Sequence, residues 1–370
     1  MIPVAEPSIG EKELKNVIKA IKSGWISSKG EFIPEFEEKF AKYCGTKYGV
    51  AASNGTVALH LALATLGMKK GDEVIVPTLT FVATANAVVY CNAKPVFVDS
   101  HPDHWCIDPE KIEEKITKNT KAIIPVHLYG HPCDMDPIVD MTRDHDLYII
   151  EDAAEAHGAE YKGRKVGSIG DIGCFSFYGN KIITTGEGGM LTTNDEEFAK
   201  KAMMLRDHAM SKEKRYWHEY IGFNYRMTNI QAALGVAQLE KIDKMVETKR
   251  KNAQSYNSLL NDVGGITLPP EATWAKNVYW MYSVLIEDEF GINRDELMLR
   301  LMENEIDSRP FFHPMHTMPP YKSDERLPIA EELSRKGISL PSAVSLKREE
   351  IEEVVNTIIG INDENSKIIF

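Results

Sequence analysis

Short apolar runs alternate with helical stretches through the first two thirds of the chain, and this alternation restricts the possible folds more than any other feature. The runs VIVP, AIIPV and YIIED are nearly continuous in apolar residues, which is typical of strands covered on both faces. Strands that alternate with helices in this way form the layered sheet of an α/β protein. We therefore predict seven strands, over residues 48–53, 73–77, 95–99, 121–127, 147–152, 173–178 and 189–194.

The last third of the chain predicts a second, smaller unit. A long helical pattern over about residues 227–260 leads into it, and a strand over residues 279–286 and two further helices follow. A length of 370 residues also favours two domains, because roughly 150 residues is the usual size of one. We predict a large α/β domain over residues 1–245 and a smaller C-terminal α+β domain over residues 246–370.

Composition and charge exclude several classes of protein. Apolar residues make up 43% and charged residues 26%, as in ordinary globular proteins. The formal net charge of −12 opposes binding to nucleic acid, which needs a basic surface. Five scattered cysteines without a CxxC pair indicate reduced thiols, and no signal peptide, membrane span or metal-ligand spacing is evident. We expect a cytoplasmic protein without a metal site, a nucleic-acid partner or a membrane partner.

Lys181, in the segment SFYGNKIITTGEGG, is the first candidate for chemistry. It follows a predicted strand and precedes a glycine-rich turn, so its amine is placed at a strand end, where ligands collect in open α/β sheets. A lysine acts as a nucleophile only where burial or a neighbouring cation lowers its pKa. Considered alone, a loop lysine is most often a solvated surface residue, so other segments must supply that environment.

Asp152, at the end of a predicted strand in YIIEDAAEAHG, is the second candidate. A buried carboxylate keeps a pyridine nitrogen protonated, and a protonated ring is a strong electron sink. The alternative is a cap on a following helix, because aspartate suits helix N-termini. The neighbouring Glu151 points to the other face of the strand and is the weaker candidate.

An anion site is indicated where a strand turns through Asn54 and Gly55 into a helix. Free N–H groups at a helix N-terminus bind anions, and a glycine allows a close approach. Such a turn is also common without any ligand. Ser176, five residues before Lys181, is placed to add a hydroxyl group to the same phosphate.

Together these segments supply a phosphate site, an acid for a ring nitrogen and a lysine for an aldehyde. Pyridoxal phosphate requires these three groups of a protein. Their conjunction predicts this cofactor more strongly than any one segment does.

Several segments resemble the DegT/DnrJ/EryC1/StrS family of sugar aminotransferases. The resemblance is carried by NGTVALHLAL, GDEVIVPTLTFVATANAV, VHLYGHPCDMD, IIEDAAEAHGA, SFYGNKIITTGEGGM and GFNYRMTNIQAALGVAQLEKID. It extends over nearly the whole chain, to IDSRPFFHPMHTMPPY and GISLPS near the end. It implies an aspartate-aminotransferase-like (type I) fold with a large seven-stranded mixed sheet, and a homodimer whose active sites lie at the subunit interface.

The resemblance also assigns roles to individual residues. The cofactor-binding residues would be Gly55, Thr56, Phe81, Asp152, Glu155, Ser176, Lys181 and Asn224, of which Lys181 and Asp152 would be catalytic. The phosphate would lie on the glycine and the hydroxyl groups of this set, with Asn224 reaching it from the neighbouring subunit. Phe81 would cover one face of the cofactor ring. Glu155 stands where many members of the family have glutamine, which would alter hydrogen bonding to the cofactor's phenolic oxygen.

Transamination is the activity that the resemblance implies, because Lys181 is present where some relatives carry histidine and act as dehydratases. L-Glutamate would supply the amino group, and C4 of a nucleotide-linked 4-keto-6-deoxyhexose would receive it. GDP-4-keto-6-deoxymannose is the favoured acceptor, for surface polysaccharide (O-antigen) synthesis, and dTDP- or UDP-linked sugars are alternatives. A non-catalytic sensor that keeps the cofactor, and a lyase or decarboxylase acting on an amino acid, are the rival classes.

Substrate contacts are predicted in two stretches. Arg309, His313 and His316 lie in the proline-rich loop RPFFHPMHTMPPY and are candidates for the sugar or its pyrophosphate. The alternative is a loop that packs between the domains and leaves these side chains in solvent. Trp25 and Ser27, in GWISSKG, are candidates for the sugar pocket, and an arm packed on the partner subunit explains them equally well.

Overall fold

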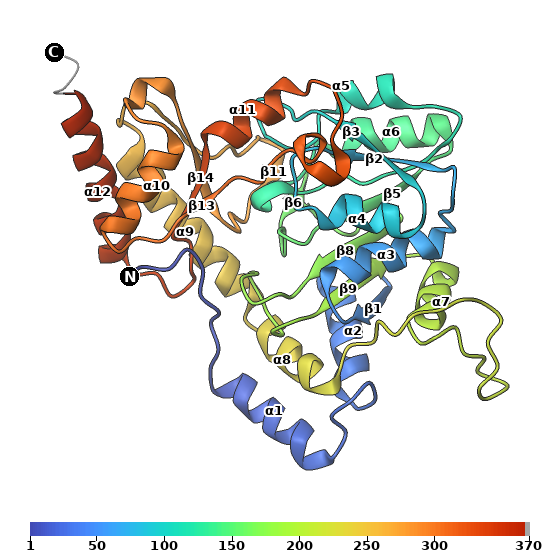
Figure 1. Ribbon diagram of the computed structural model, residues 1–370. Helices are drawn as coiled ribbons and strands as arrows, with labels where there is room; N and C mark the ends of the chain where they lie inside the picture. The colour runs from blue at the N-terminus through green and yellow to red at the C-terminus, as the bar shows by residue number, and fades with distance from the viewer. Residues whose placement is uncertain (367–370) are drawn as a thin grey trace.

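A mixed seven-stranded sheet forms the centre of the large domain in the computed structural model, which describes residues 1–366 (Figure 1). All seven predicted strands are confirmed. In spatial order they are β1 (Tyr48–Ala52), β9 (Gly189–Thr193), β8 (Ile172–Ser176), β5 (Tyr148–Asp152), β4 (Thr120–Ile123), β2 (Glu73–Pro77) and β3 (Lys94–Val98). The strand predicted over residues 121–127 ends early, at Ile123, since Pro125 has no N–H group for the ladder.

The direction of the strands determines where the chain can build a site. β9 runs antiparallel to both of its neighbours, β1 and β8. β8, β5, β4, β2 and β3 all run parallel to one another. The carboxyl ends of these parallel strands and of β1 therefore meet at one edge of the sheet, which is where ligands bind in open α/β folds.

Helices cover both faces of this sheet, as the apolar character of its strands predicts (Figure 1). Val74 and Val76 of β2 enter one buried apolar cluster with α3 and α4, whereas Ile75 between them enters another with α2 and α8. The helices of this domain are α1 (Glu11–Ser23), α2 (Phe32–Cys44), α3 (Gly55–Leu66), α4 (Ala83–Tyr90), α5 (Pro109–Ile112), α6 (Met135–His145), α7 (Glu196–Leu205) and α8 (Asn229–Leu239).

The long helix predicted over residues 227–260 is divided in two. α8 ends at Leu239, and α9 (Ile242–Leu260) begins after Lys241, whose backbone is not helical at φ −119° and ψ 8°. The Lys241 amine donates to the carbonyl of Ser8 and pairs with Glu13, which holds this corner against the N-terminal segment. The break lets the chain leave the large domain in a new direction.

A four-stranded antiparallel sheet with helices on it forms the smaller C-terminal α+β domain. Its strands are β10 (Ile266–Thr267), β12 (Tyr282–Ile286), β14 (Gly337–Leu340) and β13 (Arg309–Pro310), and its helices are α9, α10 (Arg294–Glu303), α11 (Pro328–Lys336) and α12 (Arg348–Ser366). The predicted boundary at residue 245 falls within α9, and Ile2 pairs with Ile306 and packs in the same apolar cluster as α12. The N-terminus accordingly lies beside the small domain in Figure 1. The domain limits stay a prediction, and residues 367–370 lie outside the described residues.

Shorter elements complete the description. They are the strands β6 (Glu160–Tyr161), β7 (Arg164–Lys165) and β11 (Ala275–Lys276), which form a three-stranded sheet, and the 3-10 turns η1 (Glu113–Lys115), η2 (Leu128–Gly130), η3 (Asp288–Phe290), η4 (Met315–Thr317) and η5 (Pro319–Tyr321). Within residues 1–366 no helix is both long and apolar enough to cross a bilayer. In the same part of the chain no group of three histidine, cysteine or acidic side chains is arranged to hold a metal ion.

Candidate active site

A cavity of about 610 Å³ opens at the carboxyl edge of the large sheet. It is walled by segments that follow β1, β2, β5 and β8, and by two aromatic residues of the small domain. The predicted residues that line it are Gly55, Thr56, Phe81, Asp152, Glu155, Ser176 and Lys181. Residues separated by more than a hundred positions are thus brought together because their strands end at one edge.

An anion site lies at the start of α3. Asn54 caps this helix by accepting a hydrogen bond from the N–H of Val57 at 3.0 Å, while the N–H groups of Gly55 and Thr56 have no partner within the described residues. A Cβ on Gly55 would lie only 2.7 Å from the Cβ of Ser176. Glycine is therefore required for the close approach of helix and strand, and that approach places the Ser176 hydroxyl beside the free N–H groups.

Asp152 ends β5 with its carboxylate directed into the cavity. Its Oδ2 accepts a hydrogen bond from the Thr84 hydroxyl at 2.8 Å, and its Oδ1 accepts one from the N–H of Ala154 at 3.2 Å. Burial raises the pKa of this carboxyl, and the hydrogen bond from Thr84 partly opposes that effect. No helix follows within residues 153–159, so the alternative role as a helix cap is wrong.

Glu151 points to the opposite face of the strand, as expected. Its two oxygens accept hydrogen bonds from the N–H groups of Gly167, Ile169 and Gly170, each at 2.7 Å. Oε2 also pairs with Nε2 of His127 at 3.1 Å. Burial alone would raise the pKa of Glu151, but these bonds lower it overall. Glu151 holds the loop before β8 in place and takes no part in the cavity.

The amine of Lys181 lies inside the cavity and not on the surface. Its Nζ is 3.8 Å from the centre of the Trp280 ring and 4.0 Å from Oε1 of Glu155. Burial lowers the pKa of Lys181, and the carboxyls of Glu155 and Asp152 oppose this. The structure thus supplies the environment that an amine nucleophile requires, and the surface-loop alternative is wrong.

An aromatic wall that sequence reasoning missed closes this side of the cavity. Tyr129 stacks between Trp280 and Phe312, with ring centres 6.2 Å and 5.4 Å away, and the Trp280 N–H donates to the carbonyl of Asn180 at 2.8 Å. Phe312 also packs against Phe81, at 5.9 Å. Because Trp280 and Phe312 come from the small domain, only the folded chain brings them to Lys181.

The comparisons with known proteins agree with this geometry. The model of the DegT/DnrJ/EryC1/StrS aminotransferase family matches residues 7–359. The chain belongs to this family. It is 49% identical to GDP-perosamine synthase of Caulobacter vibrioides, over 96% of both chains, and 47% identical to GDP-perosamine synthase of Escherichia coli O157:H7, over 96% of this chain and 97% of that one. The structure of the chain also matches a solved structure of the sugar aminotransferase Spr1654 from Streptococcus pneumoniae in its pyridoxal phosphate (PLP) form. The TM-score is 0.92 and the identity 28%, over 98% of this chain and 99% of that one.

The protein is therefore a pyridoxal phosphate-dependent aminotransferase with the type I fold of its family. The residues of the cavity fit the cofactor: a glycine cradle with free N–H groups suits its phosphate, a buried carboxylate its ring nitrogen and a buried amine its aldehyde. When bound there, the cofactor supplies an electron sink for the carbon that loses a proton.

Six predicted residues of this aminotransferase are absent from the cavity lining of the described chain, and five of them are exposed or paired elsewhere. Asn224 is exposed and its Oδ1 accepts hydrogen bonds from Arg226. Trp25 and Ser27 are also exposed, and their carbonyls accept hydrogen bonds from Asn229 at the start of α8. The remaining two are Arg309, which is paired with Asp307, and the exposed His313. None of them contacts this chain's own site, so their roles stay predictions.

His316 requires a correction. Its ring is only 2% exposed, Nδ1 is 2.7 Å from the Thr78 hydroxyl, and Nε2 is 3.3 Å from Glu331. Both ring nitrogens are occupied, which leaves none for a sugar or a pyrophosphate. His316 packs its loop against the end of β2, as the domain-packing alternative predicted, but its side chain is buried and not solvated as that alternative expected.

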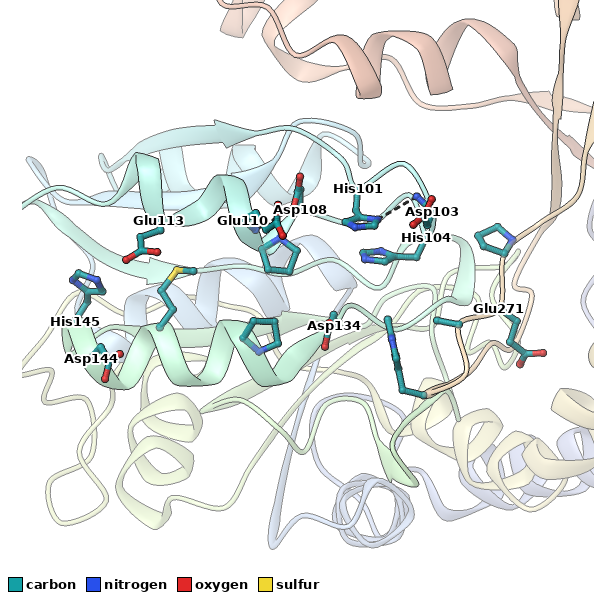
Figure 2. Close-up of a pocket in the computed structure, with 16 residues that line it drawn as sticks. His101, Asp103, His104, Asp108, Glu110, Glu113, Asp134, Asp144, His145 and Glu271 are labelled. Carbon is teal, nitrogen blue, oxygen red and sulfur yellow. Dashed lines mark hydrogen bonds between the residues drawn. The ribbon is translucent and has the colours of Figure 1, made fainter.

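A second cavity, of about 680 Å³, lies between α5 and α6 and is lined mostly by carboxyl and imidazole groups (Figure 2). Its charged residues are Asp103, Asp108, Glu110, Glu113, Asp134, Asp144 and Glu271, with the histidines His101, His104 and His145. No lysine or arginine of the described residues lines it. A phosphate would be repelled there, so the larger cavity is not the cofactor site.

Proposed function

We propose that this aminotransferase moves the amino group of L-glutamate to C4 of GDP-4-keto-6-deoxymannose and so forms GDP-perosamine for surface polysaccharide synthesis. The acceptor is supported by three GDP-perosamine synthases that are 44–49% identical to the chain over nearly its full length. The observation that carries the chemistry is the buried Lys181 amine, held between an aromatic ring and two carboxyl groups.

Lys181 acts in this proposal as the group that moves protons. Burial lowers the pKa of this amine and so favours its neutral form, and only the neutral amine can take a proton from Cα of glutamate. In the second half of the reaction the same amine delivers a proton to C4 of the sugar. Because the lysine already lies at the reacting carbon, proximity replaces the need for a separate base.

Asp152, Thr84 and the aromatic wall orient the reaction. The carboxylate of Asp152 keeps the ring nitrogen protonated, and the Thr84 hydroxyl fixes the carboxylate in position. Trp280 and Phe312 exclude water from one side of the cavity, which strengthens the electrostatic interactions inside it.

Absorbance of the purified enzyme tests the proposal. L-Glutamate should bleach the visible band of the cofactor bound to Lys181, and GDP-4-keto-6-deoxymannose should restore it. Restoration only by a dTDP- or UDP-linked keto sugar would keep the transaminase and overturn the GDP acceptor. No bleaching by glutamate would contradict the donor and favour the sensor or lyase alternatives.

We also propose a homodimer with shared active sites. Leu14, Ile18 and Ile21 line one exposed apolar face of α1, and Trp217 is exposed in the loop between α7 and α8. Both segments project from the body of the molecule (Figure 1). Exposed apolar faces of this kind are typical of interfaces, and Asn224, in the same loop, would then be free to enter the partner's site.

Light scattering should give a mass near twice the 41.6 kDa of the chain. Ile18→Glu combined with Ile21→Glu should produce monomers with weaker cofactor binding, because two carboxylates would be buried in the interface. Leu299→Glu is the matched control, since Leu299 is 67% exposed on α10 of the small domain. A monomeric wild type would contradict the shared site.

The location is proposed to be cytoplasmic. All five cysteines are buried and none forms a disulfide, which supports a reducing compartment.

A further inference from the structure

The two carboxyl oxygens of Glu155 have different surroundings: one accepts a hydrogen bond and the other does not. The residue is only 4% exposed. Oε2 accepts a hydrogen bond from the N–H of Tyr129 at 2.8 Å, whereas Oε1 accepts none from the described residues and lies 4.0 Å from Nζ of Lys181. Oε1 is therefore the part of Glu155 that remains available to the lysine.

The backbone of Tyr129 has a strained conformation that directs its N–H group toward Glu155. Its φ of 52° and ψ of 17° lie in the left-handed region, which a residue with a large side chain rarely adopts. Stacking between Trp280 and Phe312 holds the ring, and the N–H of Phe312 donates to its hydroxyl at 3.1 Å. The same aromatic wall that borders Lys181 thus fixes the position of Glu155.

We propose that Glu155 and Lys181 share one proton whenever the lysine amine is not bonded to the cofactor, so that Glu155 stores the proton that Lys181 must lose to act as a base. The step is balanced: an ammonium and a carboxylate become an amine and a carboxylic acid, and no further reactant is needed. A buried pair of ions 4.0 Å apart lacks a direct hydrogen bond, so the neutral pair avoids an uncompensated desolvation cost.

The charged and titratable groups around Glu155 favour the stored proton. The pKa of Glu155 is raised to about 7. Burial is the largest cause and Asp152 and Cys106 act in the same direction, whereas the charge of Lys181 and the hydrogen bond from the Tyr129 N–H lower the pKa of this carboxyl. Tyr129 faces it with a phenol whose own pKa is raised by burial and by Glu155, so this phenol stays neutral. Two groups that interact this closely titrate as a pair.

This inference rests on the proposed role of Lys181 as the base, but its test needs neither glutamate nor a sugar. Enzyme loaded directly with pyridoxamine phosphate leaves the Lys181 amine free. The rate at which a small acylating reagent labels Lys181 is then measured by mass spectrometry against pH. Glu155→Gln should leave the midpoint of this profile where it is in the wild type, because glutamine replaces a carboxyl group that already holds the stored proton and is neutral. An ion pair would instead give a midpoint lower by about one to three pH units, since loss of a carboxylate no longer favours the charged amine.

Infrared difference spectra of the same samples provide the second readout. At neutral pH the wild type should show the carbonyl band of a buried carboxylic acid, and Glu155→Gln should lack it. Glu187→Gln is the matched control, because Glu187 lines the same cavity but is exposed, and it should change neither readout. A labelling midpoint lower by about one to three pH units in Glu155→Gln, or a wild type without the carboxylic acid band, would overturn the stored proton whatever the sugar substrate proves to be.

Discussion

Lys181→Ala lowers turnover by about 10⁴-fold or more in the expected result, because one change removes both the covalent attachment of the cofactor and an acid–base group that alone contributes roughly 10²–10⁴-fold. The visible band of the lysine-bound cofactor should disappear. Cofactor should still bind, since the N–H groups of Gly55 and Thr56 and the Ser176 hydroxyl remain. The measurements are single-turnover rates with glutamate, the absorbance spectrum and the cofactor content after dialysis.

Lys181→Arg separates the amine from its positive charge. Arginine keeps a cation near the Trp280 ring and the Glu155 carboxyl, but it is not deprotonated in proteins and cannot act as this nucleophile or base. It should therefore lose turnover and the visible band as completely as alanine does. A normal rate in either variant would remove Lys181 from the mechanism.

The large sheet was predictable because each of its strands carries its own local signal. β2, with the sequence EVIVP, and β5, with YIIED, are buried on both faces. Their sequences are therefore apolar runs that can be recognised without knowledge of the rest of the fold. The site at the carboxyl edge follows from this topology, because residues that end strands or begin helices meet there. Asp152 and Lys181 could be found for that reason.

The aromatic wall could not be found in this way. Trp280 and Phe312 lie in the last third of the chain, and their approach to Lys181 depends on how the small domain docks on the sheet. The spacing of apolar residues along a helix or strand carries no information about contacts between domains. Tyr129 is similar, because its left-handed backbone is stabilised by these same aromatic rings and not by its own sequence.

His316 shows the converse error. Histidine and proline in a loop suggested a ligand wall, but the burial of a side chain depends on tertiary packing. Here Thr78, at the end of β2, and Glu331, on α11, occupy both ring nitrogens. Phe312, an apolar neighbour in the same loop, lines the cavity instead.

Asp152→Asn should reduce turnover by roughly 10²–10⁴-fold, the range associated with loss of one acid–base partner. An amide cannot hold a positive charge on the ring nitrogen, so the electron sink weakens. The amide remains able to accept a hydrogen bond from Thr84, which preserves the packing of the site. Cofactor content and the visible band should therefore stay near those of the wild type while the single-turnover rate with glutamate falls.

Thr84→Val tests whether the carboxylate must also be held in its ionised form. Burial raises the pKa of Asp152 and the Thr84 hydroxyl lowers it, so removal of the hydroxyl raises the pKa further and stabilises the protonated acid. The turnover rate of Thr84→Val should consequently fall further below that of the wild type as the pH falls, and approach it as the pH rises. The turnover rate of Asp152→Asn should stay low at every pH, because asparagine has no charge to regain. A pH–rate profile of Thr84→Val parallel to that of the wild type would show that the Thr84 side chain contributes packing alone. An Asp152→Asn rate within about threefold of the wild-type rate would show that another residue is the partner of the ring nitrogen, since threefold is far below the contribution of such a group.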